Sequence, residues 1–234
     1  ASGEKRALLI SATGTGKTYA SAFAMRELGF KRVLFLVHRG QLARQTKKSY
    51  EKIFGNTVSM GLVGAGYHEY DKDYVFAMVQ TLNKDSHLME YRPDEFDCIV
   101  LDEAHHTSAG TYQKVMNYFK PKFWLGMTAT PDKRDDNIEG RNIYEIFNYQ
   151  IAYEIRLQQA MEEDLLCPFH YFGISDVALV NEKNIKARKI DGRDFNILTG
   201  DERVKHIIEQ ANYFGYSGDR VKGLIFCSRI DESI

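Results

Sequence analysis

Short apolar runs alternate with longer amphipathic or polar stretches along most of the chain. Three clear runs lie at residues 7–10, 32–38 and 96–101, and each is bounded by polar residues. Runs that are apolar on both side-chain faces are typical of strands in a parallel sheet that is covered on both faces. Because several of the stretches between them have helical spacing, the pattern predicts alternating strands and helices.

The same pattern predicts the individual elements. Strands are expected at residues 7–10, 32–38, 58–62, 74–79, 96–101, 123–127, 169–174 and 221–227. Helices are expected at residues 19–28, 41–53, 111–119, 151–163 and 201–214, with a short helix and a loop in each of 83–95 and 132–150 and a loop over 175–200. Strand–helix–strand units of this kind are right-handed and build parallel sheets. The predicted fold class is therefore α/β, with a parallel sheet and helices on both faces.

We place a domain boundary near residues 160–167. Residues 1–160 would form the first domain, and residues 161–234 would form a linker and the truncated beginning of a second α/β domain. Both ends of the sequence lie next to a predicted strand, so we expect a piece of a longer protein.

The composition is that of an ordinary globular protein, with 44% hydrophobic and 27% charged residues among 234. No apolar run approaches the length that crosses a bilayer, so we expect no membrane contact. Cys98, Cys167 and Cys227 are far apart and lie in or beside apolar runs. They are best explained as buried reduced thiols of a cytoplasmic protein. The net charge of −1 indicates no global basic field, which does not exclude a local groove for nucleic acid.

A glycine-rich turn joins the first strand to the first helix in the sequence ALLISATGTGKT, residues 7–18. Strand, glycine-rich loop and helix in this order are typical of a phosphate-binding P-loop. Gly14 and Gly16 let backbone N–H groups converge on an anion, and the helix adds its positive N-terminal end. Lys17 would reach the β- and γ-phosphates of a nucleotide, and the Thr18 hydroxyl would bind Mg²⁺.

One position departs from the general P-loop pattern, which has glycine where this chain has Ser11. A glycine-rich turn that binds no phosphate is therefore the alternative explanation. The residues expected to cradle the nucleotide are Thr13, Gly14, Thr15, Gly16, Lys17 and Thr18.

Two acidic residues, Asp102 and Glu103, directly follow the strand at residues 96–101. An aspartate there could hold Mg²⁺ through water, facing the P-loop on the neighbouring strand. The adjacent glutamate could orient and deprotonate an attacking water. A lysine, a metal and a carboxylate suffice for phosphoryl transfer, which needs mainly positioning and charge neutralisation. An acidic N-cap of the next helix is the alternative explanation.

Three motifs in a fixed order identify a family. ATGTGKT (residues 12–18), DEAH (102–105) and TATP (128–131) together resemble the first motor domain of superfamily 2 DEAD/DEAH-box helicases and translocases of the bacterial restriction-subunit and DNA-repair type. FLVHRGQLARQ (35–45) is similar to motif Ia of these proteins, and GLIFCSR (223–229) is similar to motif IV. The resemblance implies paired RecA-like domains, of which the second would be incomplete here. Members of the superfamily commonly have alanine or serine at the first P-loop position.

The resemblance also implies roles for the site residues. Lys17 and Thr18 would bind ATP and Mg²⁺, Asp102 would bind the Mg²⁺, and Glu103 would be the catalytic base. His105 would couple the nucleotide site to the nucleic-acid site.

Residues of two further motifs would connect hydrolysis to movement on nucleic acid. Thr128 and Thr130 would link hydrolysis to domain movement. The side chains expected to face nucleic acid are Arg39, Gln41 and Thr81. A solvated turn after a strand is the alternative for these three residues. Gly40 stands where members of this family often have an acidic residue, so the local contacts of motif Ia are expected to differ here.

Two other features favour packing over ligand binding. His105 and His106 are adjacent on one predicted helix and would point to different faces, which makes a zinc site improbable. Trp124 lies inside an apolar strand and is expected in the core.

The sequence predicts an ATP-dependent helicase or translocase motor that uses ATP and Mg²⁺ and acts on DNA rather than RNA, together with further domains or subunits. Two alternatives stay open: a restriction-system motor subunit that moves duplex DNA, and a nucleotide-switched binding module. No arginine-finger motif follows Arg229, and such a finger is worth about 10³ to 10⁵ in rate. We therefore expect this sequence to hydrolyse ATP very slowly by itself.

Overall fold

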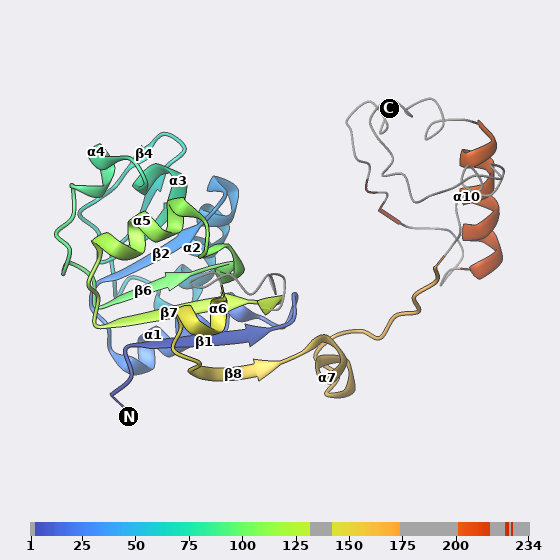
Figure 1. Cartoon of the computed structure of the whole chain (residues 1–234), viewed down its shortest axis with the longest axis horizontal. Coiled ribbons are helices and arrows are strands. Elements are labelled where there is room, and N and C mark those ends of the chain that lie inside the picture. Colours follow the sequence, from blue (N-terminus) through green and yellow to red (C-terminus); the bar gives the residue numbers. More distant parts are fainter. Residues whose placement is uncertain (1–2, 132–141, 174–200, 216–222, 225, 227–234) are drawn as a thin grey trace. The chain divides into compact units, whose positions relative to one another are not determined.

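The computed structural model describes residues 3–131, 142–173, 201–215, 223–224 and 226 (Figure 1). Contacts between Cα atoms divide the chain into two units, Ala1–Pro168 and Phe169–Ile234. The first unit holds one sheet with the helices that cover it. Within the described ranges, no helix has the length and apolar character needed to cross a membrane.

The described strands of the first unit form one eight-stranded sheet in the order β4-β3-β5-β2-β6-β7-β1-β8. All neighbours are parallel except β3 and β4. The bounds are β1 (Arg6–Ser11), β2 (Val33–Val37), β3 (Met60–Gly64), β4 (Tyr67–His68), β5 (Tyr74–Met78), β6 (Cys98–Leu101), β7 (Phe123–Thr128) and β8 (Ile151–Ile155). The predicted α/β class is confirmed. The antiparallel β4 was not predicted, because two exposed residues carry no apolar pattern.

Helices cover both faces of this sheet, as predicted. Their bounds are α1 (Lys17–Leu28), α2 (Gly40–Phe54), α3 (Val79–Leu82), α4 (Asp85–Leu88), the 3₁₀ helix η1 (Ala104–His106), α5 (Gly110–Tyr118), α6 (Ile143–Ile146) and α7 (Leu157–Glu162). Successive residues of β2 enter two different cores. Leu34 and Leu36 pack in the core under α5, whereas Phe35 and Val37 pack in the core under α1 and α2. Burial on both sides explains why the strand is apolar throughout.

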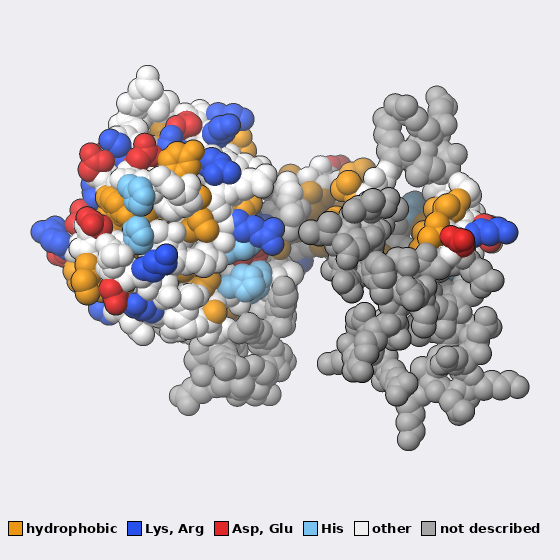
Figure 2. Space-filling view, turned by 90° about the horizontal axis from the view of Figure 1, so that it is seen from above, with side chains coloured by type: hydrophobic (Ala, Val, Ile, Leu, Met, Phe, Trp, Pro, Cys, Tyr) orange, Lys and Arg blue, Asp and Glu red, His pale blue; other side chains and the backbone are white. Residues whose placement is uncertain are grey.

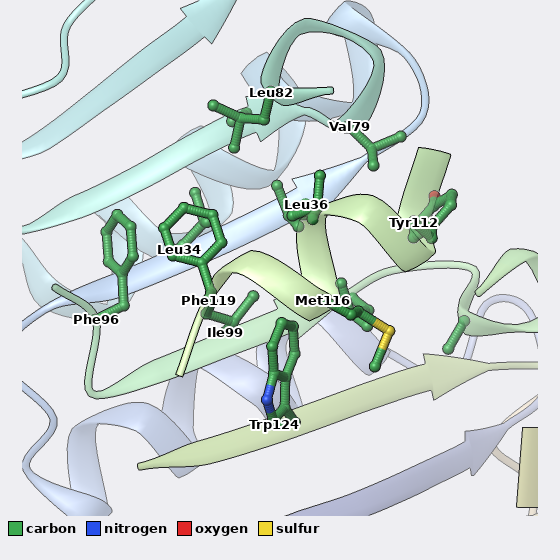
Figure 3. Close-up of a cluster of buried hydrophobic side chains, with 14 of the residues drawn as sticks. Leu34, Leu36, Val79, Leu82, Phe96, Ile99, Tyr112, Met116, Phe119 and Trp124 are labelled. Atoms are coloured by element: carbon green, nitrogen blue, oxygen red, sulfur yellow. The ribbon is translucent and has the colours of Figure 1, made fainter. Parts of the chain in front are cut away.

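Figure 3 shows the core beneath α5. Met116 and Phe119 pack there with Leu34 and Ile99 around Trp124, which is 4% exposed. The predicted core position of the indole is therefore confirmed. Buried side chains of these types each contribute about 2–5 kcal/mol relative to alanine, so this core is a principal source of stability for α5 and the strands beneath it.

The helix predicted at residues 151–163 is only partly correct. Residues 151–155 form β8, and α7 begins at Leu157. The spacing of Ile151 and Ile155 fits one helical turn, but with Tyr153 between them it also fits a strand. A strand forms because the backbone N–H and C=O groups at the open edge of β1 need hydrogen-bond partners, which residues 151–155 supply. The Leu8 N–H donates to the Gln150 carbonyl at 2.8 Å, at the start of the β1–β8 ladder.

Several other predictions differ from the structure or lie outside it. The predicted strand at residues 169–174 is wrong over 169–173, which has no regular structure, while residue 174 lies outside the described residues. The loop at 175–200 and most of the strand at 221–227 also lie outside the described residues. Cys98 is buried as expected, but Cys167 is exposed in the irregular segment that follows α7. Cys227 lies outside the described residues.

The described part of the second unit consists mainly of one helix, α10 (Asp201–Phe214), as predicted. Phe214 of this helix stacks on Phe172, with ring centroids 4.3 Å apart. The assignment of residues 161–234 to a linker and the start of a second RecA-like domain stays a prediction.

We predict that Gly126→Ala lowers the stability of the first unit. A Cβ atom on Gly126 of β7 would lie 2.4 Å from Cζ of Phe147, because the tip of this ring points at the glycine. Overpacking of this kind costs about 1–3 kcal/mol, and the midpoint of urea unfolding should fall. Gly110→Ala is the matched control, because a Cβ there meets nothing within 4 Å. Equal stability of the two variants would contradict this packing.

Candidate nucleotide-binding site

The P-loop connects β1 to α1 through two glycines with left-handed backbone conformation. Gly14 has φ 93° and Gly16 has φ 88°, values that other residues rarely adopt. Gly16 is the N-cap of α1, and no side chain caps this helix end within the described residues. The first N–H groups of α1 are therefore left for an anion. The predicted strand, glycine-rich loop and helix are confirmed as a structural element.

Lys17, the first residue of α1, folds back over the loop. Its ammonium group donates to the carbonyl oxygens of Ser11 at 2.9 Å and Ala12 at 3.3 Å. The Thr15 hydroxyl donates to the same Ala12 carbonyl at 2.7 Å and also contacts the Ser11 hydroxyl. These contacts fix the loop from inside. A phosphate bound there would take the place of the carbonyl oxygens around the ammonium.

Burial lowers the pKa of Lys17, while the Glu103 and Asp102 carboxylates act in the opposite direction. The lysine therefore lies close enough to both acidic residues of the DEAH motif for their charges to act on it. The order of the strands corrects one detail of the prediction. β6, which carries Asp102 at its end, is not the neighbour of β1, because β7 lies between them. The carboxyl ends of the three strands still meet at one edge of the sheet.

Asp102 and Glu103 occupy an unusual turn. The Asp102 N–H donates to the Leu36 carbonyl of β2 at 3.0 Å, which holds the residue at the end of the sheet. Its carboxylate accepts the Glu103 N–H at 3.1 Å. Glu103 itself has φ 51° and ψ 49°, a left-handed conformation that is strained for a residue with a side chain. Strain of this kind is found where the surrounding structure fixes a functional group.

The environment of Asp102 fits a divalent cation. Burial, followed by the charge of Glu103, raises the pKa of the Asp102 carboxyl, while Lys17 and His38 act to lower it. A buried carboxylate that has too little positive charge nearby is stabilised when a cation binds. Mg²⁺ commonly takes only one or two protein ligands and completes its shell with water and phosphate oxygens. Asp102 and Thr18, the two residues predicted to hold Mg²⁺, match this number of protein ligands.

The DEAH turn is bonded to the end of β7. His105 Nδ1 lies 3.0 Å from the Thr128 hydroxyl and 3.3 Å from a Glu103 carboxylate oxygen. The Thr128 hydroxyl accepts the Thr130 N–H at 3.1 Å. Thr128 is fully buried. A displacement of Glu103 would therefore also shift the contacts of the TATP segment.

The structure brings the three residues predicted to face nucleic acid to the same edge. Arg39 and Gln41 are exposed at the start of α2, and Gly40 lies between them. A Cβ on Gly40 would lie 2.9 Å from the Cβ of Ala65. An acidic side chain does not fit there without a shift of the loop. The glycine, which departs from the usual motif, is explained by this close approach.

The loop around Ala65 also reaches Thr81. A Cβ on Gly64 would lie 2.6 Å from the Thr81 hydroxyl. The turns that follow β2, β3 and β5 therefore meet, and Thr81 packs against Gly64 at the end of β3. Whether these side chains bind nucleic acid stays a prediction.

Sequence reasoning missed His38, which directly follows β2. Its ring lies 5.9 Å from that of His106, which lies 4.2 Å from that of His105. The available signal was a histidine at the carboxyl end of a buried strand, inside the segment that is similar to motif Ia. In the part of the chain that the structure describes, no group of three or more histidine, cysteine or acidic side chains could hold a metal ion.

Comparison with known proteins identifies the relatives of this chain. The family described as type III restriction enzyme, res subunit, matches residues 1–133. The chain belongs to this family. Its matched part includes the P-loop, the DEAH turn and TATP, so the predicted resemblance to restriction-type members of helicase superfamily 2 is confirmed.

Individual relatives agree with the family. The chain is 28% identical to a type I restriction enzyme EcoAI endonuclease subunit of Escherichia coli, over 99% of this chain and 31% of that protein. It is 25% identical to a putative ATP-dependent helicase IRC3 of Saccharomyces cerevisiae, over 88% of this chain and 31% of that protein. The chain thus spans about a third of the length of the curated relatives it matches.

Solved structures agree on the fold. A nuclease-deletion mutant of the type ISP restriction-modification enzyme LlaGI, in complex with a DNA substrate mimic, aligns with a TM-score of 0.56 and 25% identity, over 69% of this chain and 16% of that one. The helicase domain of Pyrococcus furiosus Hef aligns with a TM-score of 0.52 and 22% identity, over 64% of this chain and 35% of that one. The first unit therefore has the predicted RecA-like helicase fold.

We predict that Asp102→Asn stabilises the fold at neutral pH when no metal is present. The pKa of this carboxyl is raised in the folded state, so its ionised form opposes folding at pH values above that pKa. The neutral amide removes this opposition, and the melting temperature measured in EDTA at pH 7 should rise. The difference should disappear as the pH falls towards about 4, where the wild-type carboxyl is protonated.

Asp73→Ala is the matched control with the opposite sign. Hydrogen bonds from the Ser59 backbone and hydroxyl lower the pKa of Asp73, so its charged form supports folding. This variant should melt at a lower temperature at pH 7. A lower melting temperature for Asp102→Asn than for the wild type would contradict the prediction. It would show that neighbouring groups stabilise the ionised Asp102 carboxylate by more than its burial costs.

Proposed function

We propose that the chain is the first motor domain of an ATP-dependent translocase or helicase that acts on DNA. The observation that carries the proposal is the convergence of Lys17, Asp102 and Glu103 at one edge of the sheet, joined through His105 to Thr128. Relatives named as restriction endonuclease subunits and ATP-dependent helicases support it.

Each residue of the site has a role in this proposal. The backbone N–H groups of Thr13 to Gly16 and the Lys17 ammonium would hold the phosphates of ATP. Thr18 and Asp102 would hold Mg²⁺, which neutralises charge on the phosphates. Glu103 would orient the attacking water and accept its proton. Its strained backbone fixes the carboxylate next to Asp102 before substrate arrives, which is the arrangement that electrostatic catalysis requires.

Coupling would follow the close Glu103–His105 contact and the hydrogen bonds that join His105 and the Thr130 N–H to the Thr128 hydroxyl. Because Thr128 is fully buried, its hydroxyl cannot exchange this partner for bulk water. A change at the glutamate would then move the TATP segment, and with it the chain that follows β7. Domain closure on ATP binding and reopening on hydrolysis are motions of this class.

Nucleic acid would lie across the turns that carry Arg39, Gln41 and Thr81. Figure 2 shows basic side chains interspersed with acidic and hydrophobic ones on the visible face, without one continuous basic field. Binding would therefore depend on local contacts to the phosphate backbone. DNA is favoured over RNA because a neighbour with the same fold, LlaGI, was solved with a DNA substrate mimic. Such a motor would work in the cytoplasm.

A restriction motor that moves duplex DNA is the second candidate. The match to the EcoAI subunit over 99% of this chain favours it. A nucleotide-switched binding module without hydrolysis has less support, because a module that only binds ATP has no need for the strained backbone of Glu103.

Nucleic-acid-stimulated hydrolysis is the first test of the proposal. The full-length protein should hydrolyse ATP faster with DNA than with RNA or with no polymer. Lys17→Ala should reduce the rate by about 10²-fold or more, because charge stabilisation on the phosphates is lost. Lys31→Ala, an exposed lysine before the amino end of β2, should have no effect. No stimulation by any polymer, with ATP still bound, would favour the switched binding module.

Glu103→Gln should separate binding from hydrolysis. Loss of a general base reduces turnover by about 10² to 10⁴-fold, while the P-loop contacts to ATP are kept. The variant should therefore retain ATP and remain on DNA in a filter-binding or fluorescence assay. Glu145→Gln, at an exposed position of α6, is the control. Unchanged turnover in the Glu103 variant would exclude the assigned role.

A further inference from the structure

Tyr50 of α2 is held rigidly in the core between α2 and the sheet. It is fully buried, and its ring lies 5.1 Å from that of Phe76, 5.7 Å from that of Phe35 and 6.0 Å from that of Phe54. Edge-to-face and stacked contacts of this kind fix the plane of a ring. The direction of the Tyr50 hydroxyl is therefore set by the packing of the strands and α2.

That hydroxyl reaches the first turns of α1. Tyr50 Oη lies 2.8 Å from the Ser21 hydroxyl, which donates to the Thr18 carbonyl at 2.8 Å. A serine hydroxyl has one proton. Since Ser21 gives its proton to Thr18, Tyr50 must donate to Ser21. Burial raises the pKa of Tyr50, so the phenol remains a donor at physiological pH.

The two hydroxyls therefore join α2 to the helix turn that carries the P-loop lysine. Thr18 directly follows Lys17, and its hydroxyl is the expected ligand of Mg²⁺. At its other end, α2 begins at Gly40, between Arg39 and Gln41. A helix is stiff over this length. A displacement of the Arg39–Gln41 turn that moves α2 as a whole would therefore reach Tyr50 and, through Ser21, Thr18.

We propose that Tyr50, acting through Ser21, is a positioning residue that sets the first turn of α1 and relays the state of the Arg39–Gln41 turn to the nucleotide site. This inference rests on the proposed function, because it assumes that ATP binds at the P-loop and nucleic acid binds at the turn. It adds a connection on the α1/α2 face, opposite the face that α5 covers.

The test is Tyr50→Phe in the full-length protein, with Tyr74→Phe as the matched control. Tyr74 belongs to the same aromatic cluster, 6.2 Å from Tyr50, but its hydroxyl donates to the Phe30 carbonyl at 2.9 Å, away from α1. Both variants lose one buried hydroxyl. Only Tyr50→Phe should raise the KM for MgATP, by about three- to tenfold, the factor that one hydrogen bond contributes. It should also reduce the stimulation by DNA, while Tyr74→Phe changes neither.

Ser21→Ala provides a second variant, which also serves if Tyr50→Phe does not fold. It removes the other half of the bridge at a helical position that favours alanine. The double variant Tyr50→Phe/Ser21→Ala should be no worse than either single variant, because both changes break the same link. Independent, additive effects on KM would overturn the inference.

The outcomes also separate this inference from the proposed function. If the wild type shows no ATPase that Lys17→Ala abolishes, the proposed function fails. If the wild type is active and Tyr50→Phe has the same KM and the same stimulation as Tyr74→Phe, the positioning role alone is wrong. Melting temperatures of all variants, measured without nucleotide, show how much of any effect is general destabilisation.

Discussion

Parallel pairing of β6 with β7 and of β7 with β1 brings three strand ends to one edge of the sheet, and each polar contact of the site depends on it. Residues that are far apart in sequence meet there because parallel strands all end on the same side. Lys17 follows β1, Asp102 follows β6 and Thr128 ends β7. The strands beneath these segments fix their positions, so that His105 of the DEAH turn meets the Thr128 hydroxyl at 3.0 Å.

The site combines this rigid support with locally unfavourable features. Asp102 is a buried carboxylate, and Glu103 has a left-handed backbone. Both features oppose folding, and both are held by the two apolar cores on either side of the sheet. Trp124 and its neighbours pack on one side, while the Tyr50 cluster packs on the other. A protein without such cores would relax this turn and lose the orientation of its carboxylates.

Much of the first unit could be predicted from sequence because its strands are apolar on both faces. β2 is the clearest case, since its short, continuous apolar run has the length and composition of a strand that is buried on both faces. Prediction failed at β8, where the spacing of Ile151 and Ile155 fits a helix as well as a strand, and pairing with β1 decides between them. It also failed at residues 169–173, where aromatic residues suggested a strand but none forms. The hydrophobic pattern of a segment does not show whether another strand is available to pair with it.

The candidate site was predicted in its parts but not in its connections. The P-loop and the DEAH residues have fixed spacings in sequence, so the motifs could be found. The position of β7 between β1 and β6, the bond of His105 to Thr128 and the approach of Gly40 to Ala65 depend on tertiary structure. The same holds for the hydroxyl pair of Tyr50 and Ser21, which are 29 positions apart.

The pairing of β8 with β1 has a mechanical consequence. β8 runs parallel to β1 and leads into α7 and the rest of the chain, while β1 leads into the P-loop. A pull along β8 would load the hydrogen bonds of this ladder in shear, so that they resist together and do not open one after another. Force that reaches the first unit through the chain after β8 would thus arrive at the strand that bears the P-loop.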